Sequence, residues 1–274
     1  MPSAICLLSV VPMRKEPSHR SEMVSQLLFG EYVTMKEGNG DFVRVKCQYD
    51  GYEGWVQINQ LTPVQDHQVI STGDFIGVFT EEVFVDWRCR SMLFAVPVYY
   101  PEDSAGYIQF GSRQVSYNVR EDSVWKVAEK DFSRENLMKA VWVFLDTPYL
   151  WGGKSVFGID CSGFSQQVFK LFGKPLLRDA YLQASQGSTV EDLEDADLGD
   201  LAFFQNEVGR ITHVGILLSN SEIVHAAGKV RVDPIDKEGI TNSETGIRTH
   251  QLHSIRRFTS QAGRQSAIIS HKPE

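Results

Sequence analysis

Several features that define specialised protein classes are scarce or absent in this chain. Its 274 residues include only four cysteines, which are widely spaced and form no CxxC pair. No run of 18 apolar residues occurs, so we expect no transmembrane helix. Acidic residues outnumber basic ones by 35 to 27, and the net charge of −8 argues against a nucleic acid or an anionic membrane as a partner.

The first residues also lack the features of a targeting segment. Residues 1–17, MPSAICLLSVVPMRKEP, contain a short apolar stretch with no basic region before it. This pattern favours a strand over a signal peptide, so we expect a cytoplasmic protein; a periplasmic or secreted location is the alternative if Met1 is an engineered start. The scattered cysteines agree with a reducing compartment. We further expect a monomer that needs no cofactor and no metal.

The most informative stretch of the chain is residues 149–164, YLWGGKSVFGIDCSGF. The residues after Cys161 place apolar side chains at helical spacing up to Gly173, which predicts a helix that begins at the cysteine and ends at the glycine. A thiol on the first helical turn lies near free backbone N–H groups, so we expect its pKa to be lowered. The same N–H groups suit an oxyanion. Alternatively, Cys161 is a buried structural cysteine.

Two apolar segments downstream each carry a histidine. Residues 211–218 predict a strand that contains His213, and residues 222–228 predict a second strand that contains His225. A cysteine nucleophile needs an imidazole as general base, and that imidazole needs a third polar group to orient it. These two histidines and Cys161 supply one candidate for each role. Alternatively, His213 is a satisfied core histidine and His225 faces solvent at a strand end.

Short alternating apolar and polar segments dominate the first half of the chain, with turns of Gly and Asp between them. This pattern is typical of small β-barrels. A helical pattern follows, from an N-cap at Ser133 to a stop at Pro148. We therefore predict a first barrel over 1–64, a second and more divergent barrel over 65–128, a further domain over 129–262 and a polar tail over 263–274.

The chain resembles the NlpC/p60 papain-like cysteine peptidases of bacterial cell-wall metabolism over roughly residues 130–260. Motif identity, order and spacing all agree. The resemblance implies an α+β fold in which a papain-like NlpC/p60 catalytic domain follows two small SH3-like β-barrels. The matching residues are the run Tyr149-x-Trp151-Gly152-Gly153-x-Ser155-x-x-Gly158-x-Asp160-Cys161-Ser162-Gly163, with Gly199-Asp200-Leu201, Thr212-His213-Val214-Gly215 and Val224-His225-Ala226.

The resemblance also implies roles for these residues. Cys161 would be the nucleophile, His213 the base and His225 the residue that orients the base. The Tyr149 hydroxyl, with the backbone N–H of Cys161, would stabilise the oxyanion. Two SH3-like domains ahead of such a domain resemble the γ-D-glutamyl-L-diamino acid endopeptidases, which cut the amide between the D-Glu side chain and diaminopimelate or lysine in free murein peptides.

In that subgroup the first SH3-like domain closes one end of the cleft and grips the free amine of an N-terminal L-Ala. The matching candidates here are Asp179, Tyr52 and Glu22, because an enclosed ammonium needs carboxylates and acceptors around it. Alternatively, Asp179 is a helix N-cap, Tyr52 a turn aromatic and Glu22 a solvated loop charge. Three further residues of the motif are assigned to substrate binding: Asp160, Ser162 and Trp151.

Other functions compete with this peptidase. The chain is alternatively a wall-binding scaffold whose catalytic domain is idle, or a remodelling hydrolase that acts on intact peptidoglycan. A zinc site built from Cys161, His213 and His225 is a third alternative, although no pair of these residues has CxxC or i,i+4 spacing. Acyl transfer to an amine instead of water would use the same acyl-enzyme.

Overall fold

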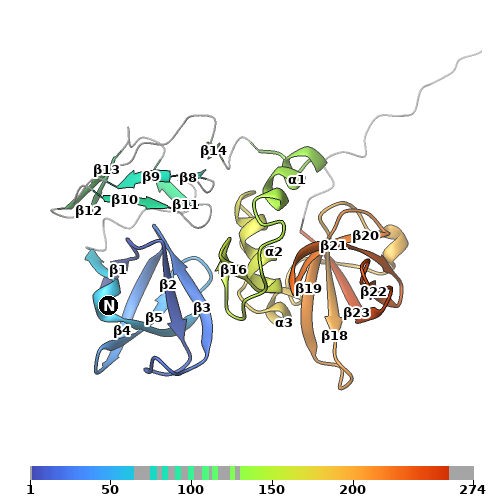
Figure 1. The fold of residues 1–274 in the computed structure, drawn as a ribbon, viewed down its shortest axis with the longest axis horizontal. Helices are drawn as coiled ribbons and strands as arrows, with labels where there is room; N and C mark the ends of the chain where they lie inside the picture. Colours follow the sequence, from blue (N-terminus) through green and yellow to red (C-terminus); the bar gives the residue numbers. More distant parts are fainter. Residues whose placement is uncertain are drawn as a thin grey trace, which may run out of the picture.

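The structure is a computed structural model that describes residues 2–64 and 130–258 and, between them, the short strands β8–β14 named below. Figure 1 shows an N-terminal sheet and a C-terminal sheet on either side of helix α2 (Cys161–Lys170). The sequence-predicted tail over 263–274 lies outside the described residues. In the described part of the chain, no helix combines the length and apolar character needed to cross a membrane.

The N-terminal sheet has seven antiparallel strands in the order β3-β2-β6-β5-β4-β1-β7. Its inner side chains form a core of their own that includes Val11, Val33, Val45 and Val56. The alternating pattern of the first half of the chain is therefore confirmed as antiparallel strands. Their bounds are β1 Ser3–Ile5, β2 Val10–Arg14, β3 Met23–Leu28, β4 Tyr32–Asn39, β5 Phe42–Cys47, β6 Glu53–Gln57 and β7 Thr62–Val64, with a 3-10 turn at Ile58–Gln60.

The predicted second barrel over 65–128 falls largely on residues outside the description. Its described strands form three small antiparallel groups, β10-β9, β11-β8-β14 and β12-β13, and they do not define a second barrel. A barrel here stays a prediction. The bounds of these strands are β8 Phe75–Val78, β9 Glu82–Val85, β10 Arg90–Leu93, β11 Val98–Pro101, β12 Tyr107–Phe110, β13 Arg113–Ser116 and β14 Val124–Lys126.

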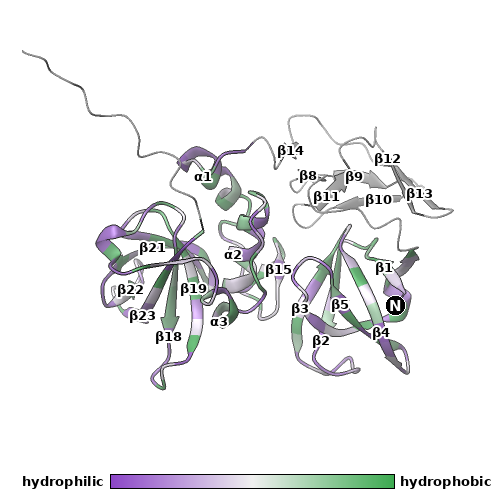
Figure 2. Ribbon diagram, turned by 180° about the vertical axis from the view of Figure 1, so that it is seen from behind, coloured by the Kyte–Doolittle hydropathy of each residue, from purple (hydrophilic) through white to green (hydrophobic). Residues whose placement is uncertain are grey.

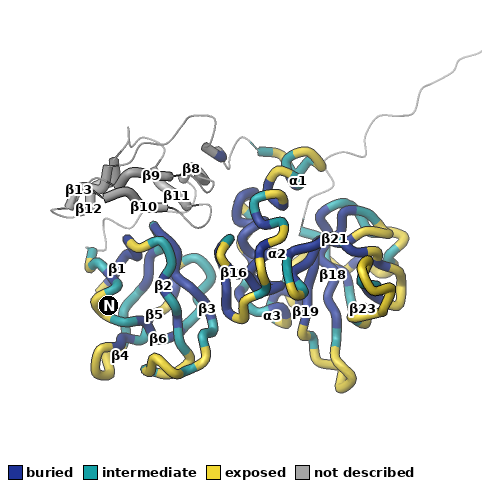
Figure 3. The backbone as a smooth tube through the Cα atoms, in the orientation of Figure 1, coloured by how far each residue is buried: buried dark blue, intermediate teal, exposed yellow. Residues whose placement is uncertain are grey.

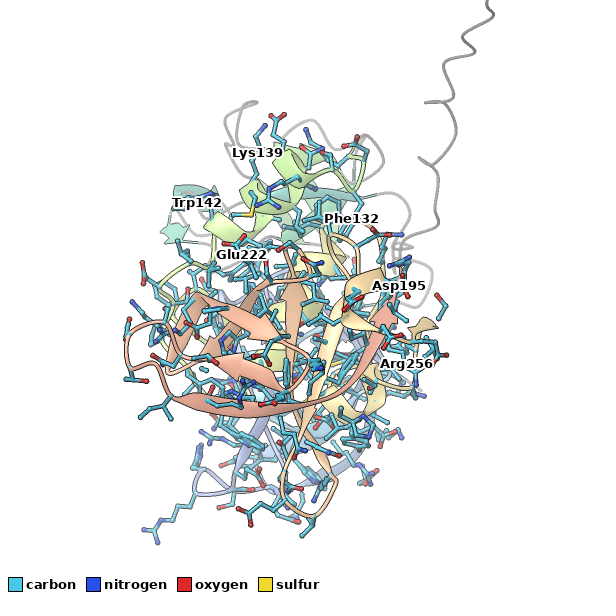
Figure 4. The ribbon with its side chains drawn as sticks, turned by 90° about the vertical axis from the view of Figure 1, so that its right-hand side faces the viewer. Phe132, Lys139, Trp142, Asp195, Glu222 and Arg256 are labelled. Atoms are coloured by element: carbon cyan, nitrogen blue, oxygen red, sulfur yellow. The ribbon has the colours of Figure 1, made fainter. Side chains whose placement is uncertain are left out.

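Helix α1 (Arg134–Trp142) begins where the sequence predicts, because the Ser133 side chain accepts a hydrogen bond from the Asn136 N–H. It ends earlier than predicted. The backbone tightens after Trp142, and Asp146 adopts a left-handed φ of 62°, so the helix stops before Pro148 is reached. Figure 4 shows Trp142 at the outer surface beside this helix end.

The C-terminal sheet closes on itself. Its order is β17-β23-β18-β19-β20-β21-β22, and β22 also pairs with β23. Apolar side chains such as Phe204, Ile223 and Ile240 form the core inside it. The strands of this sheet are β17 Ser188–Val190, β18 Leu201–Gln205, β19 Ile211–Leu217, β20 Glu222–Ala227, β21 Lys229–Asp236, β22 Gly239–Thr241 and β23 Arg248–Arg257, with a 3-10 turn at Leu193–Asp195. Three further elements precede it in the chain: the paired strands β15 Lys154–Ser155 and β16 Gly158–Ile159, and helix α3 Ala180–Gln183.

Helix α2 is the centre of the molecule. All of its residues are buried, and Figure 3 shows the helix dark along its length. The largest apolar cluster joins Phe164 and Phe169 of this helix to Val214 of the C-terminal sheet and to Leu28 of the N-terminal sheet. Figure 2 colours α2 and the two sheets by the hydropathy of each residue. The helix stops at Gly173, which has a left-handed φ of 65°, as predicted.

Charged groups are buried where the N-terminal sheet meets α2. Glu31 accepts hydrogen bonds of 3.0 Å from both Lys154 and Lys170, and the three side chains are 9%, 2% and 8% exposed. Burial alone would raise the pKa of Glu31, but the two ammonium groups lower it to about 2. The two parts of the molecule also approach closely at Gly152, where a Cβ would lie 2.4 Å from the Met23 carbonyl.

Candidate active site

The candidate nucleophile, Cys161, is the first residue of α2. The preceding residue, Asp160, has extended backbone angles, and its side chain accepts a hydrogen bond of 2.6 Å from the Gly163 N–H, which is N-cap geometry. Glycine is required at 163, because a Cβ there would lie 2.3 Å from the Gly153 carbonyl. The sequence-predicted helix start is confirmed, and it places the thiol among the first free N–H groups of the helix.

A buried ion pair holds this helix start in place. Arg178, 1% exposed, donates hydrogen bonds of 3.0 and 2.6 Å to the two oxygens of Asp160. The same guanidinium bonds the hydroxyls of Ser162 and Ser25, so it connects the catalytic helix to the N-terminal sheet. Asp160 and Ser162, which we expected to bind substrate, are thus both hydrogen-bonded to the buried side chain of Arg178.

The sulfur of Cys161 lies against the backbone on both sides of His213. The thiol donates to the Thr212 carbonyl at 4.0 Å, and the Val214 N–H bonds the sulfur. Strand β19 pairs with β20 only from Gly215 onward, which leaves this edge of β19 open to the sulfur. The fold therefore brings the nucleophile and the strand of the candidate base together.

The expectation of a lowered thiol pKa is wrong for this structure. Cys161 is 5% exposed, and burial, followed by the nearby carboxylate of Asp160, raises its pKa to about 12. Hydrogen bonds from the Val214 N–H of β19 and the Ser162 N–H of the helix start lower the pKa but do not outweigh the loss of solvent. The resting nucleophile is therefore a thiol, and it needs a base to remove its proton.

The two predicted histidines are in direct contact, 12 residues apart in the sequence. Nε2 of His213 lies 2.8 Å from Nδ1 of His225, and both rings are buried. The pKa of His213 is lowered well below its usual value by burial and then by the neighbouring rings of His250 and His225, so the ring is neutral and able to accept a proton at neutral pH. The proposed pairing of base and orienting residue has the geometry it needs.

The chain of contacts continues beyond His225 to a residue that sequence analysis missed. Nε2 of His225 lies 3.0 Å from Oδ2 of Asp233. The Asp233 carboxylate is 2% exposed and also accepts from the Ser243 N–H, the Ser243 hydroxyl and Arg231. Asp233 is eight residues beyond His225, and only the pairing of β20 with β21 brings the two side chains together.

A second missed residue, His250, covers the ring of the candidate base. The His213 and His250 rings are stacked, with centroids 4.1 Å apart and planes at 26°. His250, His213 and His225 place ring nitrogens within 4.8 Å of one another, so within the described residues these three imidazoles form a group that could hold a metal ion. That grouping does not include Cys161, in contrast to the zinc site considered from sequence.

Tyr149, the candidate oxyanion donor, lies in the segment that precedes α2 in the chain. Its backbone N–H bonds the Gly228 carbonyl, and it forms an isolated bridge with Ile159. Burial raises the pKa of its hydroxyl, and the nearby Cys161 would raise it further when ionised. The hydroxyl therefore keeps its proton and remains a hydrogen-bond donor.

Two of the three candidate amine-binding residues meet across the boundary between the sheets. The Tyr52 hydroxyl donates to Oδ1 of Asp179 at 3.3 Å. Asp179 occupies the N-cap position of α3, but its side chain makes no capping hydrogen bond, so it is not used as a cap. Burial raises the pKa of Asp179, partly offset by Arg178, and burial likewise raises the pKa of Tyr52.

The third candidate, Glu22, contacts a different residue. Its Oε1 accepts a hydrogen bond of 2.8 Å from the indole Nε1 of Trp151, and its Oε2 pairs with Lys15 at 3.4 Å. Trp151, which precedes Gly152 and Gly153, is 60% exposed, so an acid from the N-terminal part of the molecule holds an exposed aromatic ring in position. The Glu22–Trp151 and Tyr52–Asp179 hydrogen bonds thus each join the N-terminal part of the molecule to the peptidase part.

Comparison with known proteins finds matches over both parts of the chain. Residues 146–249 match the model of the NlpC/P60 family, and residues 13–61 match the bacterial dipeptidyl-peptidase Sh3 domain. The chain is 31% identical over 254 residues to the gamma-D-glutamyl-L-lysine dipeptidyl-peptidase of Bacillus subtilis (strain 168), covering 86% of this chain and 81% of that protein. It is 26% identical over 260 residues to dipeptidyl-peptidase 6 of Lysinibacillus sphaericus, covering 86% and 93%.

A solved structure shows the same fold. The crystal structure of an NlpC/P60 family protein from Bacillus cereus ATCC 10987 superposes with a TM-score of 0.77 at 22% sequence identity, covering 93% of this chain and 99% of that one. This structural match shows the fold, and the match over most of the Bacillus subtilis relative shows the family. The chain belongs to the NlpC/P60 family of cysteine peptidases and carries an SH3 domain at its N-terminal side.

Proposed function

We propose that this protein hydrolyses the γ-D-glutamyl–L-diamino acid amide of free murein peptides that begin with L-Ala, as a step of cell-wall recycling. The names of the Bacillus subtilis and Lysinibacillus sphaericus relatives support a dipeptidyl-peptidase activity. The observation that carries the proposal is the contact of Tyr52 with Asp179, because it places an acid and a hydroxyl from two domains beside the catalytic helix.

Asp179 is suited to bind an ammonium group. None of the ion pairs in the described part of the chain includes it, since the neighbouring Arg178 is paired with Asp160. A half-buried carboxylate without a cation gains a charge-assisted hydrogen bond when an amine arrives. The Tyr52 hydroxyl, bonded to the same carboxylate, fixes the position at which that amine is held.

This binding site also explains why the proposed substrate is a free peptide. In intact peptidoglycan the L-Ala nitrogen is part of an uncharged amide, which would leave the Asp179 charge without a partner. An unpaired buried charge costs enough to discriminate strongly between the two substrates. Action on intact wall, the alternative weighed from sequence, would require that this discrimination is absent.

The reaction proceeds through a thioester on Cys161. His213 takes the thiol proton as the sulfur bonds to the γ-carbonyl carbon, and the oxyanion is held by the Cys161 N–H and the Tyr149 hydroxyl. His213 then gives the proton to the amine of the diamino acid, and the C–N bond breaks. Water attacks the thioester, His213 takes its proton, and the sulfur leaves and is reprotonated.

Product analysis tests the proposal. L-Ala-γ-D-Glu-L-Lys and its diaminopimelate analogue should each yield L-Ala-D-Glu and the free diamino acid, identified by mass spectrometry. Cys161→Ala should abolish turnover, whereas Cys47→Ala, which alters a buried cysteine of the N-terminal sheet, should keep it. Near-normal activity of Cys161→Ala, or products cut at another bond, would refute the proposal.

A further inference from the structure

Both ring nitrogens of His225 are hydrogen-bonded, and the two partners differ in kind. Nδ1 faces Nε2 of His213 at 2.8 Å, and Nε2 faces Oδ2 of Asp233 at 3.0 Å. An ionised carboxylate only accepts hydrogen bonds, so the proton of a neutral His225 must be on Nε2. Nδ1 then carries a lone pair and can only accept.

The tautomer of His225 in turn decides the tautomer of His213, the proposed base. Because Nδ1 of His225 accepts, His213 must carry its proton on Nε2 and donate it across the 2.8 Å contact. The other nitrogen of His213, Nδ1, is then left with the lone pair that a general base requires. We propose that Asp233 is a positioning residue that sets the tautomers of both imidazoles, an inference that rests on the peptidase reaction proposed above.

The surroundings of Asp233 suit this role. Burial would raise the pKa of Asp233, but bonds from the Ser243 backbone, His225, the Ser243 hydroxyl and Arg231 outweigh it and lower the pKa, so the group is ionised at neutral pH. Burial lowers the pKa of His225, so that ring is neutral. The charge states on which the tautomer argument depends are therefore those of the resting protein.

The fold also fixes the direction of each contact. On β21, Arg231 lies opposite His225 in the register and Asp233 lies two residues further, on the same face. The two carboxylate oxygens are differently engaged: Oδ1 accepts from the Ser243 N–H, the Ser243 hydroxyl and Nη2 of Arg231, while Oδ2 faces Nε2 of His225 and lies 2.9 Å from Nε of Arg231. A side chain at position 233 therefore cannot rotate its oxygens freely.

This asymmetry makes Asp233→Asn a sharp test. The amide oxygen should take the place of Oδ1, because three hydrogen-bond donors point at Oδ1 and only His225 and Nε of Arg231 face Oδ2. The amide NH₂ then faces Nε2 of His225. His225 then has to accept at Nε2 and carry its proton on Nδ1, which drives the proton of His213 onto the wrong nitrogen. We expect kcat to fall on the order of 10³-fold or more with little change in KM, as a wrong base tautomer does in serine peptidases.

The matched control is Asp236→Asn. Asp236 lies on the same strand, is exposed, and pairs with Arg248, and none of its hydrogen bonds in the described part of the chain goes to a histidine, so its replacement should leave kcat within twofold. In both variants and the unchanged protein, ¹⁵N NMR of the histidine rings reads the tautomers directly. We expect protonated Nε2 on His213 and His225 in the unchanged protein and in Asp236→Asn, and protonated Nδ1 in Asp233→Asn.

The two readouts separate this inference from the proposed function. If the protein cuts no γ-D-glutamyl peptide, the proposed function fails, while the NMR tautomers still decide the role of Asp233. A proton on Nδ1 of His225 in the unchanged protein overturns the inference whatever the substrate. So does an Asp233→Asn protein with kcat within twofold of normal, or one whose ring tautomers are unchanged.

Discussion

The hydroxyl of Tyr52 donates a hydrogen bond of 3.3 Å to the carboxylate of Asp179, although the two residues are 127 positions apart in the chain. One belongs to the N-terminal sheet and the other follows the catalytic helix. The SH3 domain therefore contacts the peptidase domain at the residue that we propose to bind the amine of the substrate.

Replacing the acid of this pair should weaken substrate binding more than chemistry. Asp179→Asn keeps an acceptor for Tyr52 but removes the charge, so KM for L-Ala-γ-D-Glu-L-Lys should rise roughly 10- to 100-fold, the loss expected for a hydrogen bond to a charged group. Tyr52→Phe should raise KM less. Steady-state kinetics measure both, with Asp192→Asn, an exposed acid elsewhere, as the control. An unchanged KM for Asp179→Asn would contradict the amine-binding role.

Glu22 is expected to act through Trp151, because its Oε1 accepts the indole N–H at 2.8 Å. Glu22→Gln keeps an oxygen that can accept this bond, whereas Glu22→Ala does not. KM should therefore rise several-fold in the alanine variant and little in the glutamine variant. Equal effects of the two changes would show that the charge of Glu22, and not its bond to Trp151, matters for the substrate.

The buried ion cluster between the two sheets should dominate the effect of pH on stability. Glu31→Gln removes the counter-charge of Lys154 and Lys170, and breaking a buried pair in this way costs about 3–5 kcal/mol. Urea unfolding at pH 7 measures this cost. The exposed pair of Glu37 with Arg44 is the control, since solvent screens this pair and Glu37→Gln should leave the stability nearly unchanged.

The sign of the pH effect follows from the pKa of Glu31. Its pKa falls from an ordinary value of 4.5 to about 2 on folding, so the ionised group stabilises the fold at every pH above 4.5. That stability should be lost as the pH falls from 4.5 through 2, and the loss should be smaller in Glu31→Gln. An equal loss in both proteins would contradict the assignment.

The acid limit of activity should depend on His250. His213 must be neutral to accept the thiol proton, and its pKa is lowered by burial and then by His250, so kcat/KM should stay high well below pH 6.5. His250→Phe keeps a flat ring against His213 but removes a neighbour that can become positive. Protonation of His213 then becomes easier, and the acid limb of the kcat/KM profile should move to higher pH. An unmoved limb would contradict this account.

Local sequence predicted the residues whose roles depend on local structure. Cys161 follows an N-cap and lies at a helix start, and His213 and His225 lie on strands joined by a short turn, so their positions follow from patterns of a few residues. The sequence does not show in the same way which of these side chains are buried. The helix start alone suggested a lowered thiol pKa, and the enclosure of Cys161 by distant segments reverses it.

The residues that sequence analysis missed depend on register or on contacts between domains. Asp233 reaches His225 only because of how β21 pairs with β20, and His250 reaches His213 from the last strand of the sheet. Arg178 was next to a predicted residue, but its partner Asp160 is 18 positions away and buried with it. No local pattern in the sequence marks these contacts, because they are set when the sheet closes.

The most direct test of the whole account compares one peptide with and without a blocked amine. In the N-acetylated form of L-Ala-γ-D-Glu-L-Lys, a neutral acetamide replaces the ammonium group that Asp179 is proposed to bind. The kcat/KM values of the free and acetylated peptides should differ by 100-fold or more in the unchanged protein, by analogy with sites that leave a buried polar group unpaired, and by far less in Asp179→Asn. Equal cleavage of the two peptides by the unchanged protein, or equally fast release of peptides from intact peptidoglycan, would contradict it.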